Sequence, residues 1–467
     1  MTRVEKTRSI DMTSGPLFGK ILWFILPLIA TNLLQMLYNA ADIVVVGLSS
    51  DPDAVGAVGS TSAFLNLVVN IFIGFSTGAD VVVARYIGAR DRENTSRSVH
   101  TAICMGLIFG VVGGVVGIAL ARPVLSLMGY EGNLLELGLR YCCIYLACLP
   151  FLALTNFLCA ILRAKGDTRT PLFVLAGAGL LNVLLNLFFV LVVGLSVEGV
   201  AIATAIANAT SAVLLWRHLA CDKGDCRISF RLLRPSRAQF LEISRIGFPA
   251  GLQNAMFSIS NMLIQSSILQ VNNTVTPPNS AYAPVIKGDS ATNSIEGFLF
   301  SALNATTVAA SAFTGQNVGV GDYRRVRRVL LLVAAVSVGI AAVMSGAILI
   351  FHDPLLSLYG VTNAEDTLSQ LAYNTAMSRV WFKWPTFVIF AMMNSAAGVL
   401  RGLGKSMTSA TISLVGTCVF RVVWIYTVFA AIGRVEAIYI SYPISWFLTG
   451  AVFWVTVLIM LKRKIKV

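Results

Sequence analysis

Long apolar runs recur along the whole chain and limit what it can fold into. Each run is long enough to cross a ~30 Å hydrocarbon core as a single helix. The twelve runs cover residues 21–47, 55–84, 99–121, 136–162, 171–194, 197–216, 246–270, 291–314, 329–351, 371–400, 407–432 and 437–461. Only 12% of the 467 residues are charged, against about a quarter in soluble domains. The sequence therefore predicts an all-α integral membrane protein with twelve transmembrane helices.

The basic residues are distributed unevenly between the loops. If the N-terminus is cytoplasmic, the cytoplasmic segments hold 28 of the 35 Lys and Arg and the opposite side holds four. The remaining three lie inside predicted helices. This bias is the positive-inside pattern of membrane proteins, and it places both termini in the cytoplasm. The net charge of +13 thus orients the chain, and we expect no nucleic-acid partner.

The two halves of the chain resemble each other. Ile25-Leu26-Pro27 followed by Asn32 and Asn39 matches Gly247-Phe248-Pro249 followed by Asn254 and Asn261, at a constant offset of 222. Further matches occur in the same order along both halves. They predict two pseudo-symmetric six-helix lobes of the same orientation around a central cleft. The predicted divisions are a cytoplasmic segment 1–20, an N-lobe 21–220, an inter-lobe loop 221–240, a C-lobe 241–461 and a cytoplasmic tail 462–467.

A polar stripe follows one face of the first predicted helix. Its members are Asn32, Gln35, Asn39 and Asp42, spaced 3, 4 and 3 apart as the helical period requires. An ionised group in a bilayer costs roughly 2.5 kcal/mol or more, so Asp42 indicates an ion or proton pathway. Pro27 removes one backbone hydrogen bond and predicts a bend.

The cleft is predicted to be lined by polar residues from both halves. Helix 7 repeats the polar stripe of helix 1, and Arg421 lies in the middle of helix 11. The predicted cleft residues are Asn32, Gln35, Asn39, Asn254, Asn261, Gln265 and Arg421.

Several short motifs together resemble one family. They are the run Leu37–Asp42, the turns containing Tyr86-Ile87-Gly88 and Gly315-Gln316-Asn317, and the paired Leu-Arg turns after helices 4 and 10. With them the chain resembles the multidrug and toxic compound extrusion (MATE) transporters, most closely the DinF-like branch. The resemblance implies an antiporter that exports amphipathic, often cationic, organic compounds in exchange for H⁺ or Na⁺, with no other cofactor. It also implies a monomer among the lipids of a bacterial inner membrane.

The resemblance implies an ion-coupling site in the N-lobe. Carried over by position, its residues are Asp42, Asn182, Asn186 and Thr204, with Tyr38 one turn from Asp42. Asn182 and Asn186 are spaced i, i+4, so their amides can converge on a cation beside a carboxylate. An Asp is more typical of the DinF-like pattern at position 186. With Asn there this chain has one carboxylate at the site instead of two, and both coupling ions stay open.

The C-lobe is expected to lack a carboxylate site, because helices 7 and 10 carry only amides where the other branch of the family has acids. Asp80 is expected to be the only other acid deep in an apolar run, as a structural partner of Arg85 or another base. For Arg379 and Lys383 two interpretations stay open, a functional one and snorkelling to the outer interface. Arg421 is too central to snorkel, so it either pairs with an acid across the cleft or binds anionic parts of a substrate.

Other functions find less support in the sequence. Gly74 to Gly78 fits the G-x-S-x-G nucleophile pattern, but small residues are common where membrane helices pack. No metal, ATP or protease motif is found, and no channel filter. A lipid-linked saccharide flippase of the same superfamily is the alternative, and it would need a more basic cleft. Asn272–Ser290, which contains the pair Pro277-Pro278 and several Asn and Ser, is expected to form an external loop.

Overall fold

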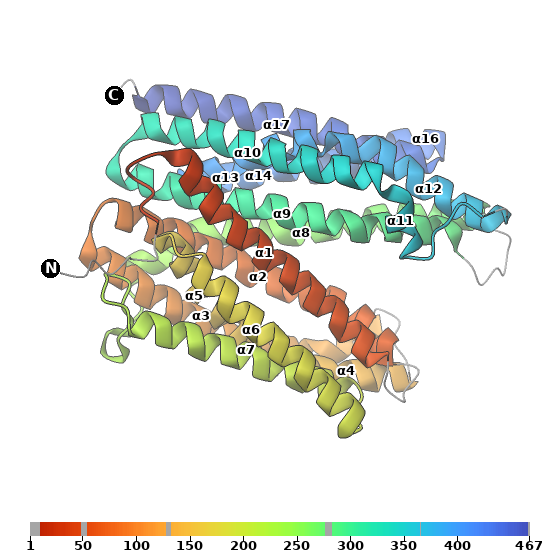
Figure 1. Ribbon diagram of the computed structural model, residues 1–467, viewed down its shortest axis with the longest axis horizontal. Helices are drawn as coiled ribbons and strands as arrows, with labels where there is room; N and C mark the ends of the chain where they lie inside the picture. Colours follow the sequence, from red (N-terminus) through yellow and green to blue (C-terminus); the bar gives the residue numbers. More distant parts are fainter. Residues whose placement is uncertain (1–9, 48–53, 128–131, 276–282, 365, 466–467) are drawn as a thin grey trace. The chain divides into compact units, whose positions relative to one another are not determined.

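The structure, a computed structural model, describes residues 10–47, 54–127, 132–275, 283–364 and 366–465. Within these ranges all regular secondary structure is helical and no strand is present (Figure 1). By contacts the chain divides into two compact units. The first unit contains residues 1–252 and 315–322, and the second contains residues 253–314 and 323–467.

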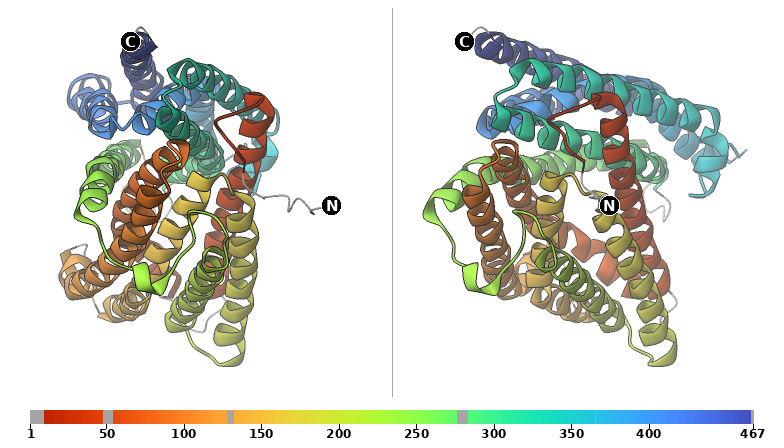
Figure 2. Two further views of the ribbon diagram at one scale, coloured as in Figure 1. Left: turned by 90° about the vertical axis from the view of Figure 1, so that its left-hand side faces the viewer. Right: turned by 60° about the vertical axis from the view of Figure 1, so that its left-hand side comes forward.

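The first unit is built from seven complete helices and the ends of two others. It contains α1 (Leu17–Val46), α2 (Ala54–Gly88), α3 (Arg92–Leu127), α4 (Gly132–Ala147), α5 (Leu149–Lys165), α6 (Arg169–Leu187) with the π-turn η1 (Phe188–Val192), and α7 (Val197–Ala220). The short 3₁₀ turn η2 (Phe230–Leu232) and the start of α8 (Arg237–Val275) follow. Its buried core is almost entirely aliphatic and aromatic. Helix α6 packs between α1 and α7, side by side in both views of Figure 2.

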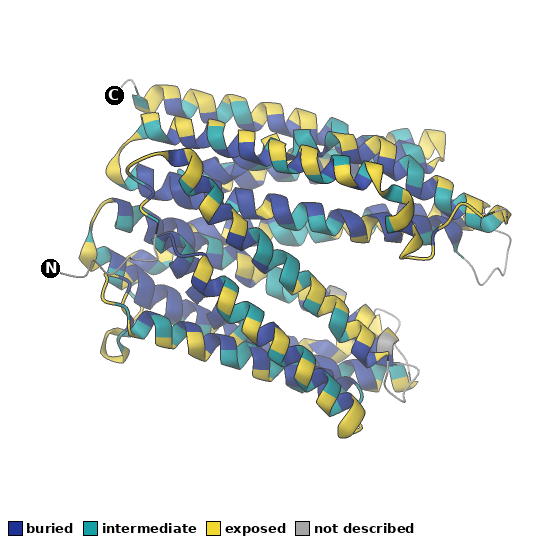
Figure 3. Cartoon of the chain, in the orientation of Figure 1, coloured by how far each residue is buried: buried dark blue, intermediate teal, exposed yellow. Residues whose placement is uncertain are grey.

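The second unit contains the rest of α8 and a set of helices broken by short irregular turns; the last residues of the first of these helices, 315–320, belong to the first unit. These are α9 (Pro284–Val320), α10 (Tyr323–Ile350), α11 (His352–Ser357), α12 (Thr367–Lys383), η3 (Trp384–Thr386), α13 (Phe387–Gly402), α14 (Ser406–Ser413), η4 (Leu414–Val419), α15 (Phe420–Trp424), η5 (Ile425–Phe429), α16 (Ala430–Ile432) and α17 (Val435–Ile465). Helix α17 packs along α12 and α13, and α10 packs on α13. Buried faces run along these helices opposite exposed ones (Figure 3).

The predicted fold class is confirmed. Each of the twelve apolar runs falls in a helix or in a broken helical segment. In the described part of the chain nine helices are long and apolar enough to cross a membrane, and the bent pair α4–α5, which meets at 47°, makes a tenth. The other two runs correspond to α8, which is 39 residues long, and to the interrupted segment α12–η3–α13.

Prolines and a capping carboxylate explain several helix ends. Pro150 lies in the first turn of α5, directly after the break from α4, where its missing N–H needs no partner. Pro385 lies in η3 in the same way. Asp366 caps α12, since its Oδ2 accepts a hydrogen bond from the Ser369 N–H at 3.1 Å. Pro27 does not end α1, which continues through it, and the Thr31 hydroxyl donates to the Pro27 carbonyl at 2.8 Å.

The G-x-S-x-G stretch lies inside α2 and packs helices together. A Cβ on Gly74 would come within 2.2 Å of the Gly251 backbone on α8, so only glycine allows this approach. The Ser76 hydroxyl donates to the Ile73 carbonyl of its own helix at 2.9 Å. The motif therefore has a packing role, and no strand-to-helix turn of the kind that a nucleophile needs occurs there.

The expected external loop is shorter than the sequence indicated. Asn272 belongs to α8, and α9 already begins at Pro284; residues 276–282 lie outside the described ranges. The Asn272 Oδ1 accepts a hydrogen bond from the Val285 N–H at 3.2 Å, which ties the end of α8 to the start of α9. The expectation failed because polar residues of a buried helix start, Asp289 among them, look like loop residues in sequence.

Candidate functional site

The first unit contains a chain of polar side chains from three helices. Asp42 on α1 accepts a hydrogen bond from the Asn186 amide on α6, with Nδ2 to Oδ1 at 2.5 Å. The same amide also reaches Asn182 Oδ1 at 3.3 Å. Asn182 Nδ2 in turn donates to the Thr204 hydroxyl on α7 at 3.2 Å. The structure thus brings together four of the five residues that the family resemblance assigned to an ion site.

This polar chain is enclosed by apolar helix faces. Asn186 is fully buried and Asn182 is 6% exposed, whereas Asp42 is half-buried. The Oδ1 atom of Asn186 is buried and accepts no hydrogen bond from the described residues. An unused buried amide oxygen beside a carboxylate can coordinate a hard cation, or it can accept a hydrogen bond from the carboxyl group once that group is protonated.

Tyr38 lies beside this polar chain and makes no hydrogen bond to it among those found in the described residues. Its ring lies against Gly179 of α6, where a Cβ would come within 1.8 Å of the ring. Its hydroxyl donates to the Ala176 carbonyl at 3.0 Å. Tyr38 therefore fixes the approach of α1 to α6, which positions Asp42 against Asn186. The other members of the α1 stripe differ, since Gln35 and Asn39 are exposed and Asn32 is half-buried.

Asp80 lies in α2 with a different partner from the first one expected. Its side chain is 2% exposed and lies 3.8 Å from Arg163 Nε, measured to Oδ2. Arg85 instead pairs with Glu242 at 2.8 Å, and Tyr86 donates to the same carboxylate at 2.8 Å. Of the two partners that the prediction left open, Arg85 or another base, the structure shows another base, Arg163.

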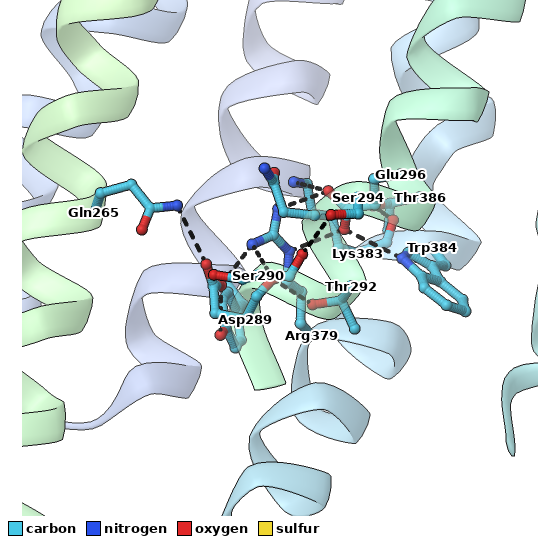
Figure 4. A network of polar contacts seen from close by, with 12 residues as sticks. Gln265, Asp289, Ser290, Thr292, Ser294, Glu296, Arg379, Lys383, Trp384 and Thr386 are labelled. Carbon is cyan, nitrogen blue, oxygen red and sulfur yellow. Dashed lines mark hydrogen bonds and ion pairs between the residues drawn. The ribbon is translucent and has the colours of Figure 1, made fainter. Parts of the chain in front are cut away.

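The second unit contains a buried charge cluster of two acids and two bases (Figure 4). Glu296 accepts from Arg379 Nε at 3.0 Å and from Arg379 Nη2 at 2.7 Å. The same carboxylate accepts from Lys383 Nζ and, at 3.1 Å, from Trp384 Nε1. Asp289 accepts from Arg379 Nη1 at 2.5 Å. All four charged side chains are at most 3% exposed.

The charge cluster overturns two expectations and rules out one of two interpretations that the sequence left open. A C-lobe carboxylate group does exist, because Asp289 and Glu296 both lie on α9. Asp80 is not the only other deeply buried acid, and Arg379 and Lys383 do not snorkel, since both are buried against carboxylates. A sign of this cluster is present in the sequence. Two acids are spaced i, i+7 and two bases are spaced i, i+4, so each pair lies near one face of its helix, and the acids and bases are equal in number.

A cavity of about 330 Å³ lies beside the charge cluster, inside the second unit. Its walls carry the bases Arg379, Lys383 and Arg421 among amides and aromatic rings. Asn261 and Gln265, both predicted cleft residues, also line it, and Gln265 Nε2 donates to Asp289 Oδ2 at 3.3 Å. Asn254 is half-buried on α8 outside the cavity lining.

Arg421 differs from the other two bases. It is 5% exposed, its Nε donates to the Ser445 hydroxyl at 3.2 Å, and its Cζ lies 4.1 Å from the centre of the Tyr442 ring. In the described part of its own unit, no acid lies within ion-pair distance of it.

These features define a multi-pass integral membrane protein with ionisable side chains held inside two helical units, a class that includes ion-coupled transporters. The MatE family model matches residues 27–188 and residues 284–427. These two stretches make up more than half of the chain, which therefore belongs to the MatE family. Members of this family are transporters and not enzymes. One family model matching twice is also the result expected if the two halves are repeats.

Individual proteins agree with this membership. The chain is 24% identical over 400 residues to "Probable multidrug resistance protein YoeA" of Bacillus subtilis (strain 168), covering 84% of this chain and 82% of that protein. A crystal structure of MATE in the straight conformation has a TM-score of 0.87 at 20% identity, covering 99% of this chain and 100% of the other. The outward-facing structure of a multidrug resistance MATE family transporter gives 0.88 at 20% identity, with the same coverage. At these identities the solved structures show a shared fold.

Proposed function

We propose that the protein is a secondary active antiporter that exports amphipathic organic compounds in exchange for H⁺ or Na⁺. The observation that carries the proposal is the contact between Asp42 and Asn186, with Asn182 and Thr204 behind it. A carboxylate is costly inside an apolar unit, and here it is surrounded by neutral groups. Such a group can be neutralised by a proton or by a bound cation, and the same two ions can drive transport.

The amide of Asn186 can serve both states of Asp42. In the structure its Nδ2 donates to the carboxylate, as an ionised acid requires. A half-turn of the amide presents Oδ1 instead, which can accept the O–H of a protonated Asp42 or coordinate Na⁺. The amide of Asn182 and the hydroxyl of Thr204 can reorient together with the Asn186 amide, because each is linked to the next by a single hydrogen bond. The loading of the ion is thereby linked to the spacing of α1, α6 and α7.

The proposed substrate class is supported by the relatives and by the family resemblance. YoeA is described as a probable multidrug resistance protein, and export of many compounds fits a cavity lined by aromatic rings and amides. The family resemblance adds cationic compounds among them. We further propose that the protein acts as a monomer in a bacterial inner membrane, surrounded by lipid, with both termini cytoplasmic as the loop charges indicate.

The flippase alternative finds little support in the charges of the second unit. A carrier of lipid-linked saccharides with anionic head groups needs several free bases. Of the three bases in the cavity of the second unit, Arg379 and Lys383 are neutralised by Asp289 and Glu296. One uncompensated guanidinium does not make a strongly basic path.

The test is dye efflux from proteoliposomes with one imposed gradient at a time. Vesicles loaded with ethidium are given a pH gradient or a sodium gradient, and loss of fluorescence is followed. We expect efflux with at least one gradient, none in Asp42→Asn, and normal efflux in Asp222→Asn, a control acid that pairs with Lys165 outside the apolar runs. Asn186→Asp, which adds a second carboxylate, should change the ion dependence. Efflux that needs ATP and neither gradient would overturn the proposal.

A further inference from the structure

We propose that the cavity of the second unit binds the anionic group of an organic substrate, a carboxylate or a similar oxyanion, and that Arg421 recognises it. The inference rests on the proposed function and names a substrate class for it. It concerns the second unit alone, and is independent of the coupling ion at Asp42.

Of the three basic side chains in the cavity wall, one is not paired with an acid among the described residues. The oxygens of Glu296 are taken by Arg379, Lys383 and Trp384. Those of Asp289 are taken by Arg379, Tyr439 and Gln265. Two acids therefore balance two bases, and no carboxylate lines the cavity among the described residues. The third base, Arg421, is left as a net positive charge in the cavity wall.

The Arg421 guanidinium has donors to spare. It carries five N–H donors, of which Nε–H donates to Ser445 Oγ. Its remaining donors have no acceptor among the residues that the structure describes. Its face lies 4.1 Å from the centre of the Tyr442 ring, and Lys383 Nζ lies 3.9 Å from the same ring centre. A buried guanidinium with unused donors is costly, and a carboxylate satisfies it with two parallel hydrogen bonds.

The backbone around Arg421 is irregular on both sides. This residue lies in α15, a stretch of five residues between the π-helical segments η4 and η5. π-Helical turns are rare, and those that interrupt α-helices are frequently found at functional sites. Here they frame the one turn that presents the guanidinium to the cavity.

The rest of the cavity suits an organic body. Its apolar walls come from aromatic side chains, and amides stand between them. The aromatic residues are Phe257, Phe300, Phe390, Tyr442, Trp446 and Phe453. The volume of about 330 Å³ is at the lower end for small-molecule sites, so a body of one or two fused rings fits. A cationic head group would instead meet Arg421 and Lys383 with no free carboxylate nearby, so cationic substrates would have to bind outside this cavity.

The experiment compares three probes of one shape and different charge. Radiolabelled 2-naphthoate, 2-naphthamide and 2-naphthylmethylammonium are bound to the purified full chain in nanodiscs without any gradient, by equilibrium dialysis. We expect 2-naphthoate to bind about ten- to a hundredfold more tightly than 2-naphthamide, as charge-assisted hydrogen bonds allow. The cation should bind least. Because no gradient is used, a failure of ion coupling would leave this preference unchanged.

Variants then assign the preference to one residue. Arg421→Gln should reduce the ratio of naphthoate to naphthamide affinity to about one, and Arg421→Lys should retain part of it. Arg434→Gln, an exposed arginine of the same unit outside the cavity, should leave the ratio unchanged. If Arg421→Gln does not fold, the three-probe comparison on the unaltered protein still decides. Equal binding of naphthoate and naphthamide, stronger binding of the cation, or a full preference in Arg421→Gln would each overturn the proposal.

Discussion

Glu296 is the acid on which the buried charge cluster depends, and replacing it should destabilise the second unit. It is fully buried and accepts four hydrogen bonds, two of them from Arg379 and one from Lys383. In Glu296→Gln the two bases keep only Asp289 as a counter-charge. Removing one partner of a buried ion pair typically costs about 3–5 kcal/mol. For a unit of about 200 residues this is a fall of roughly 6–20 °C in the unfolding temperature.

The assay is thermal unfolding in detergent. Unfolding is followed by intrinsic fluorescence and by the loss of the monodisperse peak in size-exclusion chromatography. The matched control is Glu136→Gln, which removes an exposed ion pair with Arg122 and should cost at most about 1 kcal/mol. The double variant Glu296→Gln with Lys383→Met leaves one acid, Asp289, opposite one base, Arg379. It should regain about 1–3 kcal/mol of the free energy of unfolding that the single variant loses. A Glu296→Gln protein as stable as the control variant, or a double variant with no recovery, would refute the reasoning.

Three further predictions concern the first unit. Gly179→Ala pushes the Tyr38 ring away from α6 and should lower the free energy of unfolding by about 1–3 kcal/mol. In a Tyr38→Ala background the same change should lower it much less. An equal loss of stability in both backgrounds would contradict the contact. Asp80→Asn leaves Arg163 without its counter-charge and should lower the unfolding temperature while weakening dye efflux only modestly; complete loss of efflux at normal stability would give Asp80 a coupling role. Pro27→Ala restores one backbone hydrogen bond in α1 and should stiffen the helix that carries Asp42. We therefore expect slower efflux at unchanged expression. An unchanged efflux rate would show that the proline has no role in transport.

The fold could be predicted from the sequence because lipid-facing helices must be apolar along their whole length. The broken helices show the limit of that argument. The 47° bend between α4 and α5 lies within one predicted apolar run, where Pro150 was the only local sign. Hydropathy reports which segments cross a membrane, and says little about where they bend.

The candidate sites were predictable to different degrees for a physical reason. Asn182 and Asn186 share a face by spacing alone, whereas their meeting with Asp42 and Thr204 depends on how α1, α6 and α7 pack. The charge cluster cannot be predicted from the sequence around each charged residue, because that local sequence does not show which residue is its partner. Whether Glu296 neutralises Arg379 and Lys383 depends on the packing of α9 against α12, which no local pattern contains.

The most direct test of the central claim is the movement of the coupling ion itself. Purified protein in proteoliposomes is given an outward gradient of ethidium, and counter-transport is followed with a pH dye inside the vesicles and with ²²Na⁺. We expect ethidium to drive movement of one of these ions in the opposite direction, and Asp42→Asn to abolish that movement at normal protein content. Counter-transport that persists at the full rate in Asp42→Asn would remove Asp42 from the mechanism and contradict the account.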